Sequence, residues 1–353
     1  MFLADKFPHF YKHLIPEVLD LEVPTESFAD CSNCHLASTD KKSQSLTKCC
    51  TYHANMPNYM VGALLSDDSP EWQEGKKRIL DKIDNQIGVT PYGIISPLKF
   101  QELKQQRMQE GRMDVLPFEV REQLTCPYLE KGRCTVWKYR SELCITYFCN
   151  SVGAGKGKNF WGHLFQYVRA IETKLSLYAL KEVGYKGRIT LSQIDPSTHN
   201  LENKDGSVNE RLYKSLWGSH IGKEAGIYKA CHQVIAALTP EKTREILGWE
   251  IAWLENNFRE SLEIFKADLL PLLAKYDDNN IVKKVEEGKY NITSSKGRTI
   301  TLGARGLMAL KSFDGTKNLQ DIQRDSHQLL PMNHRKYKFF LEAGVLEAVT
   351  ETV

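Results

Sequence analysis

Two clusters of cysteines constrain this chain more than any other feature of its sequence. They hold eight of its nine cysteines: Cys31, Cys34, Cys49, Cys50, Cys126, Cys134, Cys144 and Cys149. The second cluster lies in one stretch, CPYLEKGRCTVWKYRSELCITYFC, which covers residues 126–149. Because 75 residues separate Cys50 from Cys126, a fold that joins the clusters must bring residues 31–50 back to residues 126–149.

The cellular compartment decides what clustered cysteines do. The N-terminal stretch MFLADKFPHFYKHLIPEVLD is interrupted by charge and proline and does not fit a signal peptide. No run approaches the roughly 18 apolar residues that a membrane helix needs. We therefore expect a cytoplasmic protein with no membrane segment. In that reducing compartment, clustered cysteines are metal ligands or catalysts more often than disulfides.

All eight clustered cysteines are therefore candidate metal ligands. Four thiolates satisfy either a tetrahedral zinc ion or an iron–sulfur cluster. Cys31 and Cys34 form a usual chelating pair, whereas the adjacent side chains of Cys49 and Cys50 diverge and suit two partners or a cluster. Zinc sites favour two pairs with the two-residue spacing, and only one is present. The spacing thus favours an iron–sulfur cluster, with zinc as the alternative.

Histidines and the ninth cysteine complete the inventory of metal-binding residue types. His35 and His53 lie near cysteines in the sequence, but eight thiolates already exceed the needs of one site. We therefore expect these histidines at the surface or supporting the ligands. Cys231 stands alone in a predicted helix and is expected to be a small buried hydrophobic residue.

The rest of the chain predicts a mainly helical α+β protein. Hydrophobic residues make up 41% and charged residues 26% of the chain, which is typical of a folded protein. The small net charge of +3 gives no indication of nucleic-acid binding. Apolar spacing and start signals predict helices over residues 71–86, 99–111, 160–183, 208–217, 223–237 and 240–275.

Three domains follow from this organisation. Residues 1–150 are predicted to form a cysteine-rich metal-binding domain of loops and short helices, and residues 151–285 a helical domain packing on it. Residues 286–353 are predicted to form a small winged-helix-like module. Its predicted elements are a strand pair turning at Lys296-Gly297, short helices near 303–312, 318–326 and 333–343, and a final strand over 345–349.

A glycine-rich basic segment, NSVGAGKGKN, covers residues 150–159 and suggests a phosphate-binding loop. The Walker pattern requires a glycine five positions before the Gly-Lys pair and a serine or threonine after it. Neither Gly155-Lys156 nor Gly157-Lys158 meets these requirements. We therefore expect a loop that leads into the following helix.

The cysteine pattern resembles the YkgJ-type cysteine-cluster family, whose members carry a zinc- or iron-chelating domain of the CxxCxxCC type. The likeness covers residues 31–150 and rests on Cys126-Pro-Tyr-Leu, Gly132-x-Cys134, Arg140 and the spacing of Cys144 and Cys149. Three features depart from the family. Fourteen residues separate Cys34 from Cys49 where the family has two, and Ser141 and Ile145 replace its proline and arginine.

The C-terminal residues resemble a second, smaller family. Residues 290–353 are similar to the winged-helix domain of PQQ-synthesis protein D, with an Asp314-Gly315 turn and a closing Gly-Val-Leu. That resemblance implies a peptide or protein partner for this module.

Three functions remain open at this point. The first is a metal-binding protein whose thiolates have a structural or redox role. The second is an iron–sulfur-dependent modifying enzyme, similar to flagellin lysine N-methylase. The third is an adaptor whose residues 290–353 bind a peptide or protein.

Overall fold

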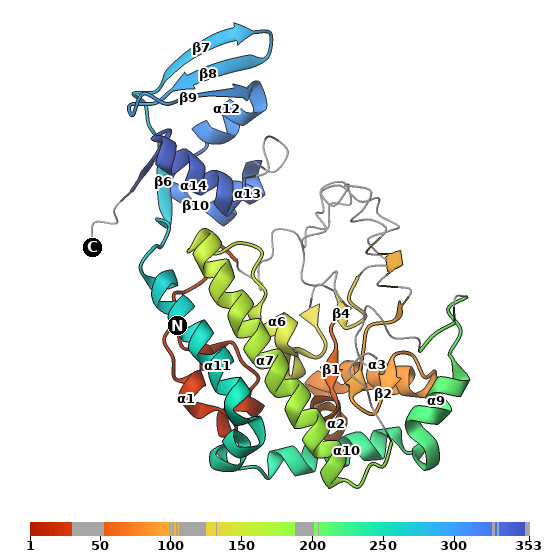
Figure 1. Ribbon diagram of the computed structural model, residues 1–353. Helices are drawn as coiled ribbons and strands as arrows, with labels where there is room; N and C mark the ends of the chain where they lie inside the picture. Colours follow the sequence, from red (N-terminus) through yellow and green to blue (C-terminus); the bar gives the residue numbers. More distant parts are fainter. Residues whose placement is uncertain are drawn as a thin grey trace. The chain divides into compact units, whose positions relative to one another are not determined.

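The computed structural model describes most of the chain outside the first cysteine cluster. The described residues are 1–29, 53–98, 100, 102–103, 105, 125–131, 133–187, 201–203, 205–326, 329 and 332–349. Cys31, Cys34, Cys49 and Cys50 lie outside them, as does most of the predicted helix 99–111. In the described residues helices predominate and the sheets are small and antiparallel (Figure 1), which confirms the mixed α+β class.

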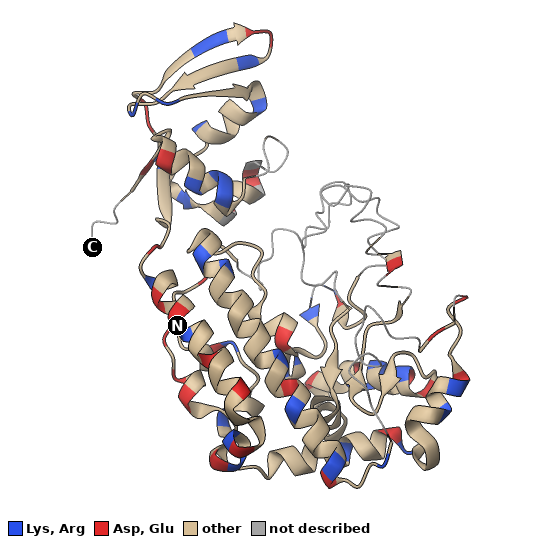
Figure 2. Cartoon of the chain, in the orientation of Figure 1, with Lys and Arg blue, Asp and Glu red and all other residues tan. Residues whose placement is uncertain are grey.

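The described residues form two compact units. Unit 1 takes them from 1–22, 53–147 and 162–258, and unit 2 from 23–29, 148–161 and 259–349. Each unit is thus assembled from segments that are far apart in the sequence. The three predicted domains stay a prediction. In both units, basic and acidic residues are interspersed along the elements (Figure 2).

Unit 1 is helical with two small sheets. Its elements are α1 (Pro16–Leu19), β1 (Met56–Pro57), α2 (Asn58–Ser66), α3 (Gln73–Asp84), β2 (Val89–Thr90), β3 (Gly93–Ile94), β4 (Leu129–Glu130), β5 (Arg133–Cys134), α6 (Glu142–Thr146), α9 (Glu210–Trp217) and α10 (Glu224–Ala236), with most of α7 (Ala154–Glu182) and α11 (Pro240–Lys266). The strands form a β1-β3-β2 sheet and a β4-β5 hairpin.

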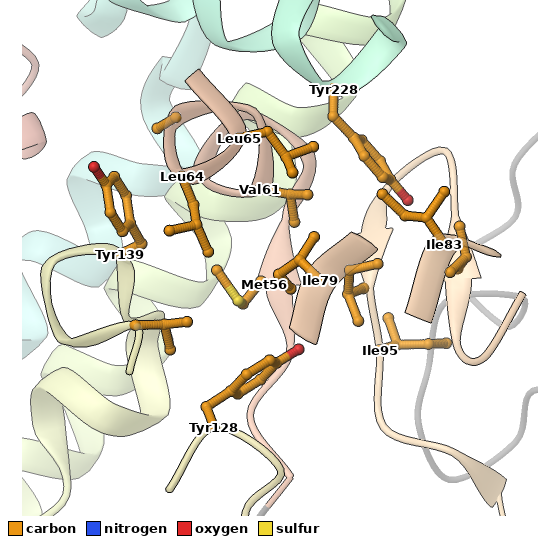
Figure 3. Close-up of a cluster of buried hydrophobic side chains, with 14 of the residues drawn as sticks. Met56, Val61, Leu64, Leu65, Ile79, Ile83, Ile95, Tyr128, Tyr139 and Tyr228 are labelled. Atoms are coloured by element: carbon orange, nitrogen blue, oxygen red, sulfur yellow. The ribbon is translucent and has the colours of Figure 1, made fainter. Parts of the chain in front are cut away.

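The core of unit 1 forms around α2, a helix that the sequence did not predict. Eight of its nine residues are buried, so it has no polar face and no amphipathic period. Side chains from α2, α3 and the strands meet there (Figure 3), including Met56, Val61, Leu64, Leu65, Ile79, Ile83, Ile95, Tyr128, Tyr139 and Tyr228. Helix α10 packs directly against α2.

Unit 2 contains most of the β structure. Its elements are β6 (Leu273–Tyr276), β7 (Ile281–Glu286), β8 (Lys289–Thr293), β9 (Thr299–Gly303), α12 (Ala304–Lys311), β10 (Asp314–Asn318), α13 (Leu319–Ser326), α14 (His334–Ala343) and β11 (Leu346–Ala348). The strands pair as two antiparallel sheets, β10-β6-β11 and β7-β8-β9. The predicted strand pair with its turn at Lys296-Gly297, the three short helices and the closing strand are all confirmed. Strands β6, β7 and β10 were not predicted.

Two predictions about the helices are wrong. The glycine-rich segment is not an extended loop, because α7 begins at Ala154 and residues 155–158 are helical. The helix predicted over 240–275 ends at Lys266 and contains a break at Gly248, whose φ of 69° is left-handed. Pro271 lies inside the predicted span, and proline has no N–H with which to continue a helix.

Candidate metal centre

The β4-β5 hairpin contains one predicted ligand, Cys134, and is hydrogen-bonded to the backbone of another, Cys126. Leu129 lies opposite Cys134 across the hairpin, and the Leu129 N–H donates to the Cys126 carbonyl at 3.0 Å. The Thr135 N–H donates to the Tyr128 carbonyl at 2.8 Å. Cys126 and Cys134 therefore flank Tyr128 on one small, hydrogen-bonded scaffold. Cys126 is buried, and Cys134 is half-buried.

A third predicted ligand, Cys144, acts on the same tyrosine. It lies on the short helix α6 and is half-buried. Burial of the ring, followed by the charges of Cys126, Cys134 and Cys144, holds the pKa of Tyr128 well above its usual range. An electrostatic effect of this kind falls with distance. Three of the predicted ligands thus lie close enough to Tyr128 in unit 1 to influence its pKa.

A lysine and a histidine lie beside this group. The Lys82 Nζ is 3.0 Å from the Nε2 of His53, and the His53 ring contacts the Tyr128 ring with centroids 6.0 Å apart. Burial lowers the pKa of Lys82 to about 8, against the opposing charges of Cys126 and Glu202. Burial and the Lys82 charge lower the pKa of His53. A neutral imidazole thus accepts a hydrogen bond from an ammonium group near Cys126.

The fourth cysteine of the second cluster belongs to unit 2. There Cys149 lies near Lys158. Burial and the Arg335 charge lower the pKa of Lys158, whereas the charge of Cys149 raises it. The next residue, Asn150, is buried, and its Oδ1 lies 3.1 Å from the Nδ1 of His334. Cys149 therefore has cationic and polar surroundings of its own.

Cys126, Cys134 and Cys144 therefore belong to unit 1, and Cys149 belongs to unit 2. In the part of the chain that the structure describes, no group of three or more His, Cys, Asp or Glu side chains has metal-binding geometry. Cys231 is completely buried in α10, which confirms the interpretation of this residue as a hydrophobic one. Burial raises the pKa of its thiol to about 12.

Sequence reasoning missed a buried pair of carboxyl groups in unit 1. The Oε1 of Glu172, on α7, accepts hydrogen bonds from the Tyr11 hydroxyl at 2.7 Å and from the Glu142 N–H at 3.0 Å. Both glutamates are more than nine-tenths buried. Burial, and then the neighbouring Glu142, hold the pKa of Glu172 well above its usual range. No local pattern joins residues 142 and 172, so only the tertiary structure reveals the pair.

Replacing Glu172 with glutamine should remove a pH dependence of stability. A carboxyl whose pKa is raised on folding stabilises the protein below its unfolded pKa and loses that contribution as the pH rises toward the folded pKa. A glutamine side chain at this position would keep an oxygen acceptor and carry no charge. We expect Glu172→Gln to gain about 1–2 kcal/mol relative to the natural chain between pH 4.5 and pH 8. Urea unfolding at both pH values measures this difference.

The exposed Glu182, on the same helix, provides the control, because Glu182→Gln should leave the pH dependence unchanged. A Glu172→Gln variant that is less stable than the natural chain at pH 8 would contradict the inference that burial and Glu142 disfavour the ionised form of Glu172.

None of the helices within the described ranges is long and apolar enough to cross a bilayer. Comparisons of the chain with protein-family models, with curated proteins and with solved structures found no match.

Proposed function

We propose that this chain is a metal-binding cysteine-cluster protein. Its ligands would come from Cys31, Cys34, Cys49, Cys50, Cys126, Cys134, Cys144 and Cys149, and would hold an iron–sulfur cluster or zinc in a structural or redox role. One observation supports the proposal: Cys134 in the β4-β5 hairpin, Cys126 bonded to that hairpin through its backbone and Cys144 on α6 all belong to the same unit.

The surroundings of these three thiols suit thiolate ligands. Metals bind the thiolate form, which positive charge and hydrogen-bond donors stabilise. The Lys82 ammonium group lies near Cys126, and the charge of Cys126 in turn favours the protonated form of Lys82. Soft sulfur ligands with donors around them fit zinc and iron–sulfur centres alike.

The choice of metal rests on the cysteine spacings. Only Cys31 and Cys34 have the two-residue spacing that zinc sites favour. Cys126, Cys134 and Cys144 are separated by seven and nine residues, and irregular spacings of this kind suit an iron–sulfur cluster. We therefore place the iron–sulfur centre ahead of zinc.

Two further functions have some support of their own. A modifying enzyme is favoured by Lys82, whose pKa of about 8 is a perturbation that is common at catalytic sites. An adaptor is favoured by β7, where every residue is exposed, including Ile281 and Val285. An exposed strand at a sheet edge can pair with an extended peptide. In the adaptor, residues 290–353 would bind the peptide or protein partner, and β7 pairs with β8 at the start of that segment.

Anaerobic purification of the natural chain and of Cys134→Ser tests the metal proposal. We expect the natural chain to be brown, with iron and acid-labile sulfide in comparable amounts, and Cys134→Ser to lose both metal content and stability. Elemental analysis, visible absorbance and thermal unfolding measure these changes. Cys231→Ala is the matched control, since Cys231 lies buried in α10, and it should keep the metal.

The alternatives give different results. A colourless protein with stoichiometric zinc would support the structural zinc form and reject the cluster. A protein that contains neither iron nor zinc after anaerobic purification and anaerobic reconstitution would overturn the proposal. A Cys134→Ser variant with unchanged metal content would show that Cys134 is not a ligand.

A further inference from the structure

Unit 1 contains an apolar cavity where α1, α7 and α11 meet (Figure 1). Its volume is about 120 Å³. The side chains of its floor are almost completely buried, namely Leu14, Val18, Tyr167, Leu247 and Ile251. An engineered apolar cavity of about 150 Å³ binds benzene. The cavity in unit 1 is therefore large enough for the side chain of an apolar amino acid.

The break in α11 forms one wall of this cavity. Gly248 lies in that wall with a φ of 69°, a conformation that favours glycine. Of the described atoms, the Lys174 Nζ lies nearest to a Cβ placed at Gly248, at 3.8 Å. The same Nζ donates to the Leu247 carbonyl at 2.7 Å, and so satisfies a carbonyl at the end of the first half of the helix. The wall is thus bare backbone in a fixed conformation.

An ion pair lies at the mouth of the cavity. Arg244, on α11, and Glu17, on α1, both line the cavity, and their side chains are 61% and 70% exposed. The Nη2 of Arg244 donates to the Oε1 of Glu17 at 3.0 Å. A guanidinium group has about five N–H donors, and a carboxylate has about four acceptor positions. Within the described ranges, this bond leaves most donors of Arg244 and most acceptor positions of Glu17 for a ligand.

A third charged group limits which ligands fit. Glu255 also lines the cavity, and its Oε2 accepts from the Tyr167 hydroxyl at 3.5 Å. The lining thus has two carboxylates and one guanidinium group, so a ligand with only a negative charge is repelled by the carboxylates. A ligand with only a positive charge must compete with Arg244 for Glu17. A zwitterion avoids both costs, because its carboxylate can bind Arg244 while its ammonium group binds Glu17.

We propose that this cavity binds a free apolar α-amino acid, with the side chain in the cavity and the zwitterionic head group on the Arg244–Glu17 pair. The end of a peptide chain carries only one of the two head-group charges, so it matches the ion pair less well. This inference goes beyond the proposed function, since the residues of the cavity are separate from the cysteines and from Lys82 and His53.

Calorimetric titration of the natural chain with leucine, isocaproate and isoamylamine tests the class of ligand. Isocaproate lacks only the ammonium group of leucine, and isoamylamine lacks only its carboxylate. We expect leucine to bind about tenfold or more tightly than either compound, because each loss removes hydrogen bonds to a charged side chain. Equal affinity for leucine and either of the other compounds would overturn the inference. The absence of leucine binding up to its solubility limit would do so as well.

Arg244→Gln and Lys242→Gln are matched variants on α11. Each removes an exposed cation that pairs with a glutamate, and Lys242 pairs with Glu245 at 2.9 Å. Only Arg244 lines the cavity. We expect Arg244→Gln to weaken leucine binding about tenfold or more, and Lys242→Gln to leave it unchanged. Equal leucine affinities of the two variants would contradict a head group held by Arg244.

Ala252→Leu tests whether the ligand lies in this cavity. Ala252 lines the cavity and is exposed, so a larger aliphatic side chain there can occupy the mouth without overpacking a closed core. We expect the variant to unfold at the same urea concentration as the natural chain and to lose leucine binding. A folded Ala252→Leu variant with natural leucine affinity would overturn the inference. If this variant does not fold, the comparison of Arg244→Gln with Lys242→Gln decides.

Discussion

Replacing Glu26 with alanine should destabilise unit 2 by about 3 kcal/mol or more. The carboxylate of Glu26 is buried and accepts hydrogen bonds from three donors among the described residues. They come from the Val152 N–H at 2.8 Å, the Ser151 Oγ at 2.7 Å and the Trp161 Nε1 at 2.5 Å. Alanine leaves all three donors buried without that partner, and each such donor costs about 1–3 kcal/mol. Urea unfolding followed by tryptophan fluorescence measures the loss.

The place of Glu26 in the fold explains why the effect should be large. Helix α7 begins at Ala154, and the first N–H groups of a helix carry partial positive charge that favours an anion. Glu26 binds the residues just before that helix. The glycine-rich segment that suggested a phosphate loop thus has a carboxylate of the same chain beside it. The segment before α7 does have the features of an anion-binding site, and the anion that it binds is the carboxylate of Glu26.

Two comparisons make this prediction sharp. Glu263→Ala removes an exposed carboxylate of unit 2 that pairs with Lys266 on the same helix, at 3.1 Å, and it should change stability by less than about 0.5–1 kcal/mol. Amide hydrogen exchange should speed up near residues 151–161 in Glu26→Ala and not in Glu263→Ala. Equal stability of the two variants would contradict a structural role for the buried carboxylate.

Local signals in the sequence predicted the elements that depend on them. Helix α11 begins at Pro240 because Thr239 and proline form a start signal, and the Thr239 Oγ1 accepts from the Lys242 N–H at 3.3 Å. The turn at Lys296-Gly297 followed from glycine, whose φ here is 74°. These elements can be predicted without knowledge of residues that are far away in the sequence.

The candidate site could be predicted only in part, for the opposite reason. Cysteine spacing defined a second cluster of four, and the structure divides it, with Cys126, Cys134 and Cys144 in unit 1 and Cys149 in unit 2. Lys82 lies on α3 and meets this group only through tertiary packing. The pair of Glu142 and Glu172 likewise depends on α6 meeting α7. Glutamates are usually solvated, and no local pattern in the sequence predicts the burial of Glu142 and Glu172.

The unpredicted helix α2 depends on the smallest of its residues. A Cβ atom at Gly62 would lie 1.9 Å from the carbonyl oxygen of Tyr228 and 2.9 Å from the Cβ of His232. Both neighbours belong to α10, so only glycine allows the two backbones to approach this closely. Gly62→Ala must push α10 away from α2, and the overpacking should cost about 2–3 kcal/mol despite the better helix propensity of alanine.

Glycine at 226 is the matched control, because it lies in α10 itself and a Cβ there would meet nothing within 4 Å. Gly226→Ala should therefore gain about 0.5–1 kcal/mol from helix propensity alone. The two substitutions add the same methyl group to neighbouring helices, so opposite signs in urea unfolding would isolate the close approach as the cause. If both variants are stabilised, α2 and α10 are farther apart in solution.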